Sequence, residues 1–62
     1  MIIIAAAELL KAYGVQASPF NLSMNKGVIE CGEYRITGSL SKPKHESDSV
    51  ELGGRTFYFW AV

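Results

Sequence analysis

The feature that most constrains the fold of this chain is a glycine turn inside an alternating segment. Gly32-Glu33 places glycine at the first central position of a two-residue turn, where a type II′ hairpin requires it. The turn pairs the flanking residues two by two: Cys31 with Tyr34, Glu30 with Arg35, and Ile29 with Ile36. Glu30 and Arg35 then form an opposite-charge pair across the strands, worth ~0.2–1 kcal/mol. Turn chemistry, alternation and charge therefore all predict the same hairpin.

A third strand precedes this hairpin. After Pro19, apolar and polar residues alternate with period two, which is typical of a half-buried strand whose apolar members are Phe20, Leu22 and Met24. A turn at residues 25–27 would pair this strand with the next in a register that places every apolar side chain on one face: Met24 opposite Ile29, Ser23 opposite Glu30, and Leu22 opposite Cys31. The sequence thus predicts a three-stranded meander over residues 21–40.

A second glycine turn, Gly53-Gly54, predicts a C-terminal hairpin. Its pairs are Leu52 with Arg55, Glu51 with Thr56, and Val50 with Phe57. Residues 41–49, which link the meander to this hairpin, are polar and offer no apolar anchor. We expect that loop to be mobile and dispensable for folding.

The first 14 residues predict a helix. Ala, Leu, Glu and Lys are strong helix formers, and Gly14 is a natural residue to end the helix. An alternative is that residues 1–4 begin as a strand, since three consecutive β-branched residues open a helix poorly. A wide apolar face follows helical spacing: Ile2, Ile3, Ala6, Leu9, Leu10 and Tyr13. The predicted fold class is α+β, one domain over residues 1–62, with an N-terminal helix packed on an antiparallel β-meander of four to five short strands in α-β-β-β-β-β order.

The size of the chain predicts self-association. A core of 62 residues is expected to supply only ~3–5 kcal/mol, and small domains often add a disulfide, a metal or a partner. Cys31 is the only cysteine and His45 the only histidine, so neither a disulfide nor a tetrahedral Cys/His zinc site can form within one chain. Of the usual supports, oligomerisation remains, and we expect a homodimer. The alternative is a monomer that folds alone, as many domains of about 55–65 residues do.

Charge and the N-terminus bear on partners and compartment. Six basic and six acidic residues balance, so the usual electrostatic reason for binding nucleic acid is missing. The apolar N-terminal run lacks the basic residues of a targeting segment, Glu8 interrupts it, and it is too short to cross a bilayer. A single cysteine suits a reducing compartment. We therefore expect a cytoplasmic protein without membrane contact.

Catalytic and metal-binding patterns are weak. A Cys31–His45 dyad is conceivable, but Cys31 falls on the predicted inner face, where a free cysteine acts as a small hydrophobe. His45, Glu46 and Asp48 share one loop, yet their spacing matches no metal-site pattern. Gly53-Gly54 lies between two strands and lacks the helix that a phosphate-binding loop precedes. We expect no enzyme activity, no catalytic residue, no cofactor and no metal.

The most informative segment for binding is the aromatic strand at the C-terminus. Its alternation places Phe57 and Phe59 toward the core and leaves Tyr58, Trp60 and Val62 on the other face. A strand that is apolar on both sides is normally covered on both sides, and Tyr and Trp are enriched at binding hot spots. The alternatives are that the helix packs on this second face, that the sheet rolls up around the strand, or that the aromatics stack on nucleobases or a small ligand.

Three classes of function follow. The favoured one is a non-catalytic protein-binding or regulatory module, adaptor-like or inhibitor-like, of a size that suits prokaryotic or phage regulators, forming a homodimer and binding another protein. The second is a nucleic-acid binder that stacks bases on Tyr58 or Trp60. The third is an enzyme, or a subunit that completes one across an interface. The candidate binding residues are Tyr58, Trp60, Val62, Lys42, Lys44, His45 and Arg55, and the nucleic-acid alternative adds Arg35 as a phosphate contact.

Overall fold

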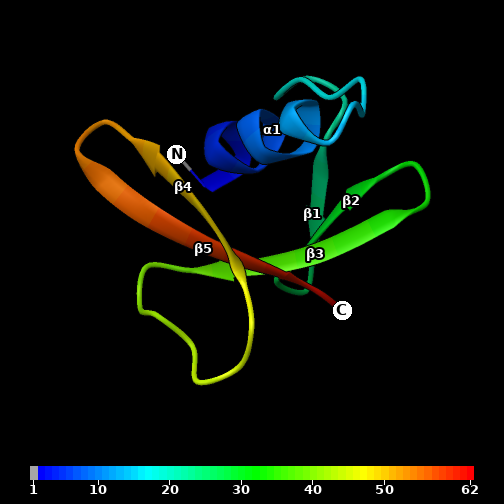
Figure 1. Ribbon diagram of the computed structural model, residues 1–62. Coiled ribbons are helices and arrows are strands. Elements are labelled where there is room, and N and C mark those ends of the chain that lie inside the picture. The colour runs from blue at the N-terminus through cyan, green and yellow to red at the C-terminus, as the bar shows by residue number, and fades with distance from the viewer. Residues whose placement is uncertain (1) are drawn as a thin grey trace.

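The computed structural model describes residues 2–62 as one helix and one antiparallel sheet (Figure 1). The elements are α1 (Ile2–Ala12), β1 (Ser23–Asn25), β2 (Val28–Cys31), β3 (Tyr34–Ser39), β4 (Asp48–Leu52) and β5 (Arg55–Ala61). The strand order is β1-β2-β3-β5-β4, so β5 lies between β3 and β4. The α+β class and the α-β-β-β-β-β order are confirmed. Figure 1 shows a strongly twisted sheet, with α1 at one end of the molecule and the β3–β4 loop at the other.

The helix forms from its second residue, so the strand alternative for residues 2–4 is wrong; Met1 lies outside the described residues. Tertiary packing of the helix outweighs the poor propensity of three isoleucines. The end of α1 is a Schellman motif, in which Val15 N donates to Leu10 O (2.9 Å) and Gly14 N donates to Lys11 O (3.0 Å). Gly14 supplies the positive φ (83°) that this motif needs. No described helix has the length and apolarity to span a membrane.

Both glycine turns set the predicted registers. Every strand pair expected next to Gly32-Glu33 and Gly53-Gly54 occurs, as do Met24 opposite Ile29 and Ser23 opposite Glu30. Gly32 has a positive φ (61°) and Glu33 does not, as a type II′ turn requires. Local turn chemistry therefore accounts for the register of both hairpins.

The core lies between α1 and the inner face of the sheet, which is the face that carries Phe57 and Phe59. Its main cluster consists of Ala5, Ala6, Leu9, Ile29, Phe57 and Phe59. Phe59 is fully buried, and the two phenylalanine rings stack with centroids 6.4 Å apart. Alanines on the buried side of α1 keep its backbone close to β4 and β5, the strands that it contacts. One short helix is thus enough to bury the centre of this face.

Two predicted boundaries are wrong. β1 begins at Ser23, and Phe20, predicted to point inward, is 99% exposed. The reason is a local turn: Asn21 N donates to Ser18 O (3.1 Å), and Ser18 N donates to Asn21 Oδ1 (2.8 Å). These bonds hold the chain out of the sheet until residue 22. The polar loop is also shorter than predicted, because β4 already begins at Asp48.

Candidate binding surfaces

The outer face of the sheet carries Tyr58 and Trp60. Phe57 and Phe59 are buried on the inner face, and the two aromatics between them are half-buried on the other side. The predicted alternation of β5 is therefore confirmed, and the alternative in which the helix packs on the Tyr58–Trp60 face is wrong. The sheet is open, with β1 and β4 at its two edges, so it does not roll up around β5.

The β3–β4 loop partly covers Trp60. The ring of His45 meets the Trp60 ring edge-on, with centroids 4.9 Å apart and an interplanar angle of 76°. The expectation that this loop has no anchor is therefore wrong, because the only histidine of the chain provides one. His45 Nδ1 also lies 3.1 Å from the carbonyl oxygen of Glu46, a local contact that favours one orientation of the ring.

The other candidate residues divide between this surface and the rest of the molecule. Lys42 and Lys44 are exposed in the loop that His45 ties to Trp60. Val62 is exposed beyond β5, and its backbone N donates to Arg35 O (3.1 Å). Arg55 does not join them, since it pairs with Leu52 on the inner face at the opposite end of β5. The structure thus gathers the loop residues beside Trp60 and leaves Arg55 apart.

Charges near the outer face are paired locally. Arg35 Nε lies 3.2 Å from Glu30 Oε2 across the β2–β3 hairpin, and Arg35 Nη1 donates to Gly32 O (2.7 Å). Arg35 is thereby occupied within its own hairpin, which makes it a poor phosphate contact.

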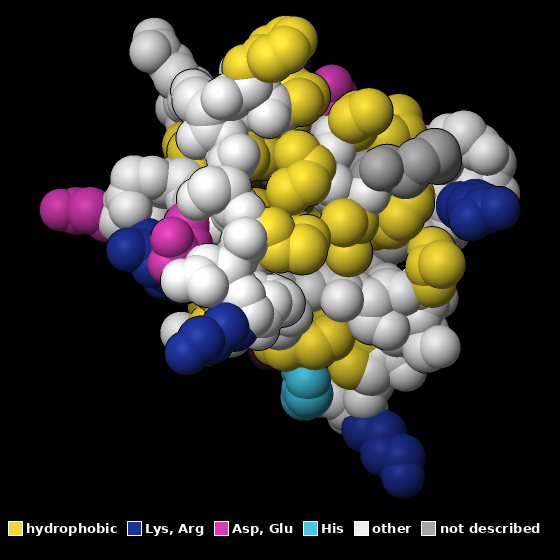
Figure 2. All heavy atoms as spheres, turned by 180° about the vertical axis from the view of Figure 1, so that it is seen from behind, with side chains coloured by type: hydrophobic (Ala, Val, Ile, Leu, Met, Phe, Trp, Pro, Cys, Tyr) yellow, Lys and Arg dark blue, Asp and Glu magenta, His cyan; other side chains and the backbone are white. Residues whose placement is uncertain are grey.

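Figure 2 shows hydrophobic side chains in a band along the middle of one view, with charged side chains at its margins and the histidine at its lower end.

Two features have no counterpart among the sequence predictions. One is Phe20, whose exposed ring stands on a turn held by Asn21. The other is an apolar cavity of about 220 Å³ between the end of α1 and the inner face, which Tyr13, Tyr34 and Asp48 help to line. Only the folded chain brings these three residues to one cavity. The sequence carries no signal for it, since Asp48 falls within the loop predicted over residues 41–49.

The phenol of Tyr13 links α1 to β4. Tyr13 Oη donates a hydrogen bond to Asp48 Oδ1, although the two residues lie 35 positions apart. This hydrogen bond raises the pKa of Tyr13 above its ordinary value of 10.0, with smaller contributions from desolvation and from the negative charge of Asp48. The phenol is therefore neutral at physiological pH and remains a donor.

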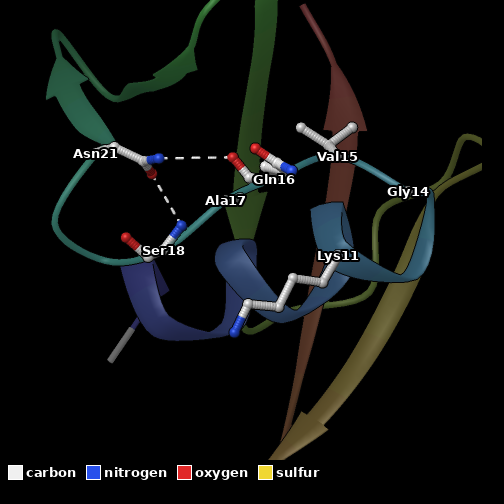
Figure 3. A pocket seen from close by; sticks show the side chains of 7 residues that line it. All are labelled: Lys11, Gly14, Val15, Gln16, Ala17, Ser18 and Asn21. Atoms are coloured by element: carbon white, nitrogen blue, oxygen red, sulfur yellow. Dashed lines mark hydrogen bonds between the residues drawn. The ribbon is translucent and has the colours of Figure 1, made fainter.

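A second, more open hollow of about 470 Å³ lies between the end of α1 and the loop that follows it (Figure 3). Its polar groups are largely satisfied within the loop: Asn21 Nδ2 donates to Gln16 O (3.5 Å), and Asn21 Oδ1 accepts from Ser18 N. Lys11 lines the hollow but lies 3.8 Å from Glu8 on the helix surface. Lys11 is the one charged side chain that lines this hollow, so no set of charged side chains converges on it.

The groups considered for catalysis do not converge. Cys31 is buried on the inner face, packed in a cluster with Ala7, Leu10 and Ala17. His45 lies beside Trp60, on the other face of the sheet. In the part of the chain that the structure describes, no three side chains of His, Cys, Asp or Glu are grouped as metal ligands.

Comparison with known proteins adds no functional information to this geometry. No protein-family model matches the chain, and comparisons with curated proteins and with solved structures find no similar protein. A functional assignment therefore depends on the chemistry of the surfaces described above.

Proposed function

We propose that this chain is a small non-catalytic protein-binding module, an adaptor or inhibitor-like regulator, that self-associates through the outer face of its sheet. The observation that carries the proposal is the pair Tyr58 and Trp60. They lie on a face that no other layer within residues 2–62 covers, apart from the His45 contact. Tyr and Trp are the residue types enriched at binding hot spots.

The energetics favour burial of this face. Each ~100 Å² of apolar surface removed from water is worth about 2.5 kcal/mol, and a large aromatic side chain carries ~150–250 Å². A second sheet packed face to face would remove most of the remaining exposure of Tyr58 and Trp60. Both are half-buried already, so only the exposed remainder of each side chain contributes to that gain.

The charge distribution suits a second copy of the chain as the partner. A twofold interface sets the same patch against itself, so a patch of one sign would repel its own copy. Here the formal net charge is zero, and Glu30 and Arg35 already form an ion pair on the outer face. The Glu30–Arg35 pair therefore adds no net charge to this face, and a different protein could dock on the same aromatics.

Nucleic-acid binding is a second candidate because of one contact. His45 ties the loop that carries Lys42 and Lys44 to Trp60, so two exposed ammonium groups lie in the loop beside an aromatic ring. Single-stranded nucleic acid is bound by such combinations of stacking and phosphate contacts. The zero net charge and the occupied Arg35 weigh against it.

We place the module in the cytoplasm. Cys31 is a free cysteine buried in the core, and reduced cysteines are usual in that compartment.

The test is sedimentation equilibrium across the micromolar range with wild type, Trp60→Ala and a matched aromatic truncation, Phe20→Ala. Wild type should sediment as a dimer. Trp60→Ala should weaken the dimer by ~2 kcal/mol or more, about 30-fold in Kd. Phe20→Ala should change the dimer little, because it removes an equally large apolar group from outside this face.

A wild-type species of 6.8 kDa at every concentration would remove the dimer from the proposal. If Phe20→Ala dissociates the dimer and Trp60→Ala does not, the dimer interface lies at the exposed turn that carries Phe20 and not at the outer face of the sheet. Binding of a labelled single-stranded oligonucleotide that falls steeply with salt, and that Lys42→Gln with Lys44→Gln weakens further, would favour the second candidate.

A further inference from the structure

The apolar cavity between α1 and the inner face of the sheet is open to solvent at two tyrosines. Its volume is about 220 Å³, and its walls include Leu10, Ile36 and Ala61. Tyr13 and Tyr34 also line it and are 61% and 52% exposed, so both rings are accessible to an incoming group. Trp60, which carries the proposed dimer surface, is also among the residues that line the cavity, so the two lie next to each other at the end of β5.

The cavity lies where β4 begins and α1 ends, next to the last residues of β5. β4 begins at Asp48, opposite Phe59, so the last residues of β5 have a neighbouring strand only on their β3 side. α1 ends at Ala12, and after the Gly14 cap the chain continues over part of the inner face, where Ala17 is buried with Cys31. Between the end of α1 and the start of β4 the inner face is left partly open. The hollow is therefore part of the chain path rather than a packing defect.

Asp48 places a carboxylate at the cavity. Its Oδ1 accepts the Tyr13 hydroxyl, and no second hydrogen bond or ion pair to this carboxylate occurs within residues 2–62. The two ion pairs formed by the described side chains use Glu8 and Glu30 instead. Asp48 is exposed to solvent, so its preference for a cation comes from a charge-assisted hydrogen bond and not from burial.

The two tyrosine rings add to the same preference. The face of an aromatic ring attracts a cation, and the attraction grows when the cation is withdrawn from water. Tyr13 also adds no second negative charge, because its hydrogen bond to Asp48 keeps the phenol protonated. An anionic ligand would be repelled by Asp48, and a purely apolar ligand would desolvate that carboxylate without compensation.

We propose that this cavity binds a small organic cation: one ammonium group, paired with Asp48, on an apolar body of about the size of a single ring. Size sets the limit, since a cavity of ~150 Å³ holds benzene and sites for drug-sized ligands measure ~300–1,000 Å³. A cavity of about 220 Å³ therefore fits one side-chain-sized group. Such a group comes either from a free amine or from a lysine side chain of a partner protein.

The experiment is an amide NMR titration of the full chain with benzylammonium. Saturable shifts are expected at Ile36, Asp48 and Ala61, which line the cavity. Benzyl alcohol and benzoate, which keep the ring and remove or reverse the charge, should bind at least about tenfold more weakly. Equal binding of benzylammonium and benzyl alcohol would overturn the proposal, and so would the absence of saturable shifts at these residues.

Three variants locate the contact. Asp48→Asn keeps an acceptor for Tyr13 and removes the charge, so it should reduce benzylammonium affinity to that of benzyl alcohol. Glu51→Gln is the matched control: it removes a carboxylate from the same strand, on the outer face, and should leave the affinity unchanged. Tyr13→Phe frees Oδ1 and keeps the ring, so it should bind at least as tightly as wild type. Loss of binding in Tyr13→Phe, or in Glu51→Gln, would overturn the role of Asp48.

A comparison of two peptides distinguishes a free amine from a lysine side chain of a partner protein as the ligand. A short peptide with one central lysine is compared with the same peptide carrying norleucine. Shifts at the cavity residues with the lysine peptide alone identify a partner side chain as the ligand. Shifts with benzylammonium and with neither peptide identify a free amine. Equal shifts with both peptides would contradict recognition of a cation.

Discussion

The two faces of β5 differ in what they do for the chain. Phe57 and Phe59 lie under α1 and are almost completely buried, whereas Tyr58 and Trp60 alternate with them on the outer face, where they are half-buried and His45 of the β3–β4 loop contacts Trp60. Four successive aromatic residues are thus divided between two faces. One pair packs in the core, and we propose that the other binds a partner.

The largest effect that this comparison predicts is on the buried face. Phe59→Ala should cost about 3–5 kcal/mol, because Phe59 is fully buried and the cavity left behind can collapse only in part. That loss equals the whole stability expected from a core of this size, so the variant should be unfolded in water. Far-UV circular dichroism and urea unfolding would measure it.

Trp60→Ala is the matched truncation on the outer face. Its cost to the isolated protomer should include the ~0.5–1.5 kcal/mol of the His45 contact and stay well below that of Phe59→Ala, when unfolding is measured at the lowest practical concentration, where a dimer is dissociated. The inference that only the inner face of β5 is needed for folding would be wrong if Trp60→Ala unfolds the chain at every concentration. It would also be wrong if Phe59→Ala lowers the free energy of unfolding only slightly.

A smaller effect is expected from Gly38→Ala, which crowds the buried face instead of emptying it. Gly38 lies opposite Phe59, and a Cβ there would stand 2.6 Å from Phe59 Cε1 and 2.7 Å from Phe59 Cδ1. The Phe59 ring is fixed in the core and cannot yield, so overpacking should cost ~1–3 kcal/mol by urea unfolding.

The second variant of this test is Gly38→Ala combined with Phe59→Leu, which removes the atoms that clash. The double variant should be less destabilised than the sum of the two single ones. Strict additivity would mean that the close approach of Gly38 and Phe59 is not the cause.

A modest effect is expected where the outer face does have a neighbour. His45→Ala removes the edge-on contact with Trp60, and such aromatic contacts are worth ~0.5–1.5 kcal/mol. Because Trp60 is the only tryptophan, its fluorescence should shift to longer wavelength as water replaces the histidine ring. Lys42→Ala, in the same loop, is the control and should leave the emission unchanged. Unchanged emission in His45→Ala would mean that the loop does not rest on Trp60 in solution.

The sheet could be predicted from the sequence wherever a turn dictates its own geometry. Gly32 and the Gly53-Gly54 pair fix their hairpins through positive φ angles, and the registers follow from alternation. The helix end was predictable for the same reason, since Gly14 takes the left-handed conformation that closes it. Each of these features depends on only a few neighbouring residues.

A local turn closed by a side chain and the contacts between distant segments could not be predicted. Phe20 fits the period of a strand, but the side chain of Asn21 closes a turn that alternation does not reveal. The position of β5 between β3 and β4 is a tertiary choice, and the contacts of His45 with Trp60 and of Tyr13 with Asp48 depend on it. The aromatic half of the candidate site was therefore predictable, whereas the cavity and the loop anchor were not.

The smallest effect concerns the ion pair on the outer face. Glu30→Gln removes the partner of Arg35 at 3.2 Å, yet both side chains are more than a third exposed to solvent. Exposed pairs are worth ~0.2–1 kcal/mol, and salt screens them, so the variant should lose a few tenths of a kcal/mol at low ionic strength and match wild type at high salt. Arg35 keeps its bond to Gly32 O, so the hairpin turn should survive. Urea unfolding of both proteins at two salt concentrations measures the difference. A loss as large as that of Gly38→Ala, independent of salt, would mean that the outer face is packed in the folded protomer, and the contrast between the two faces of β5 would then be wrong.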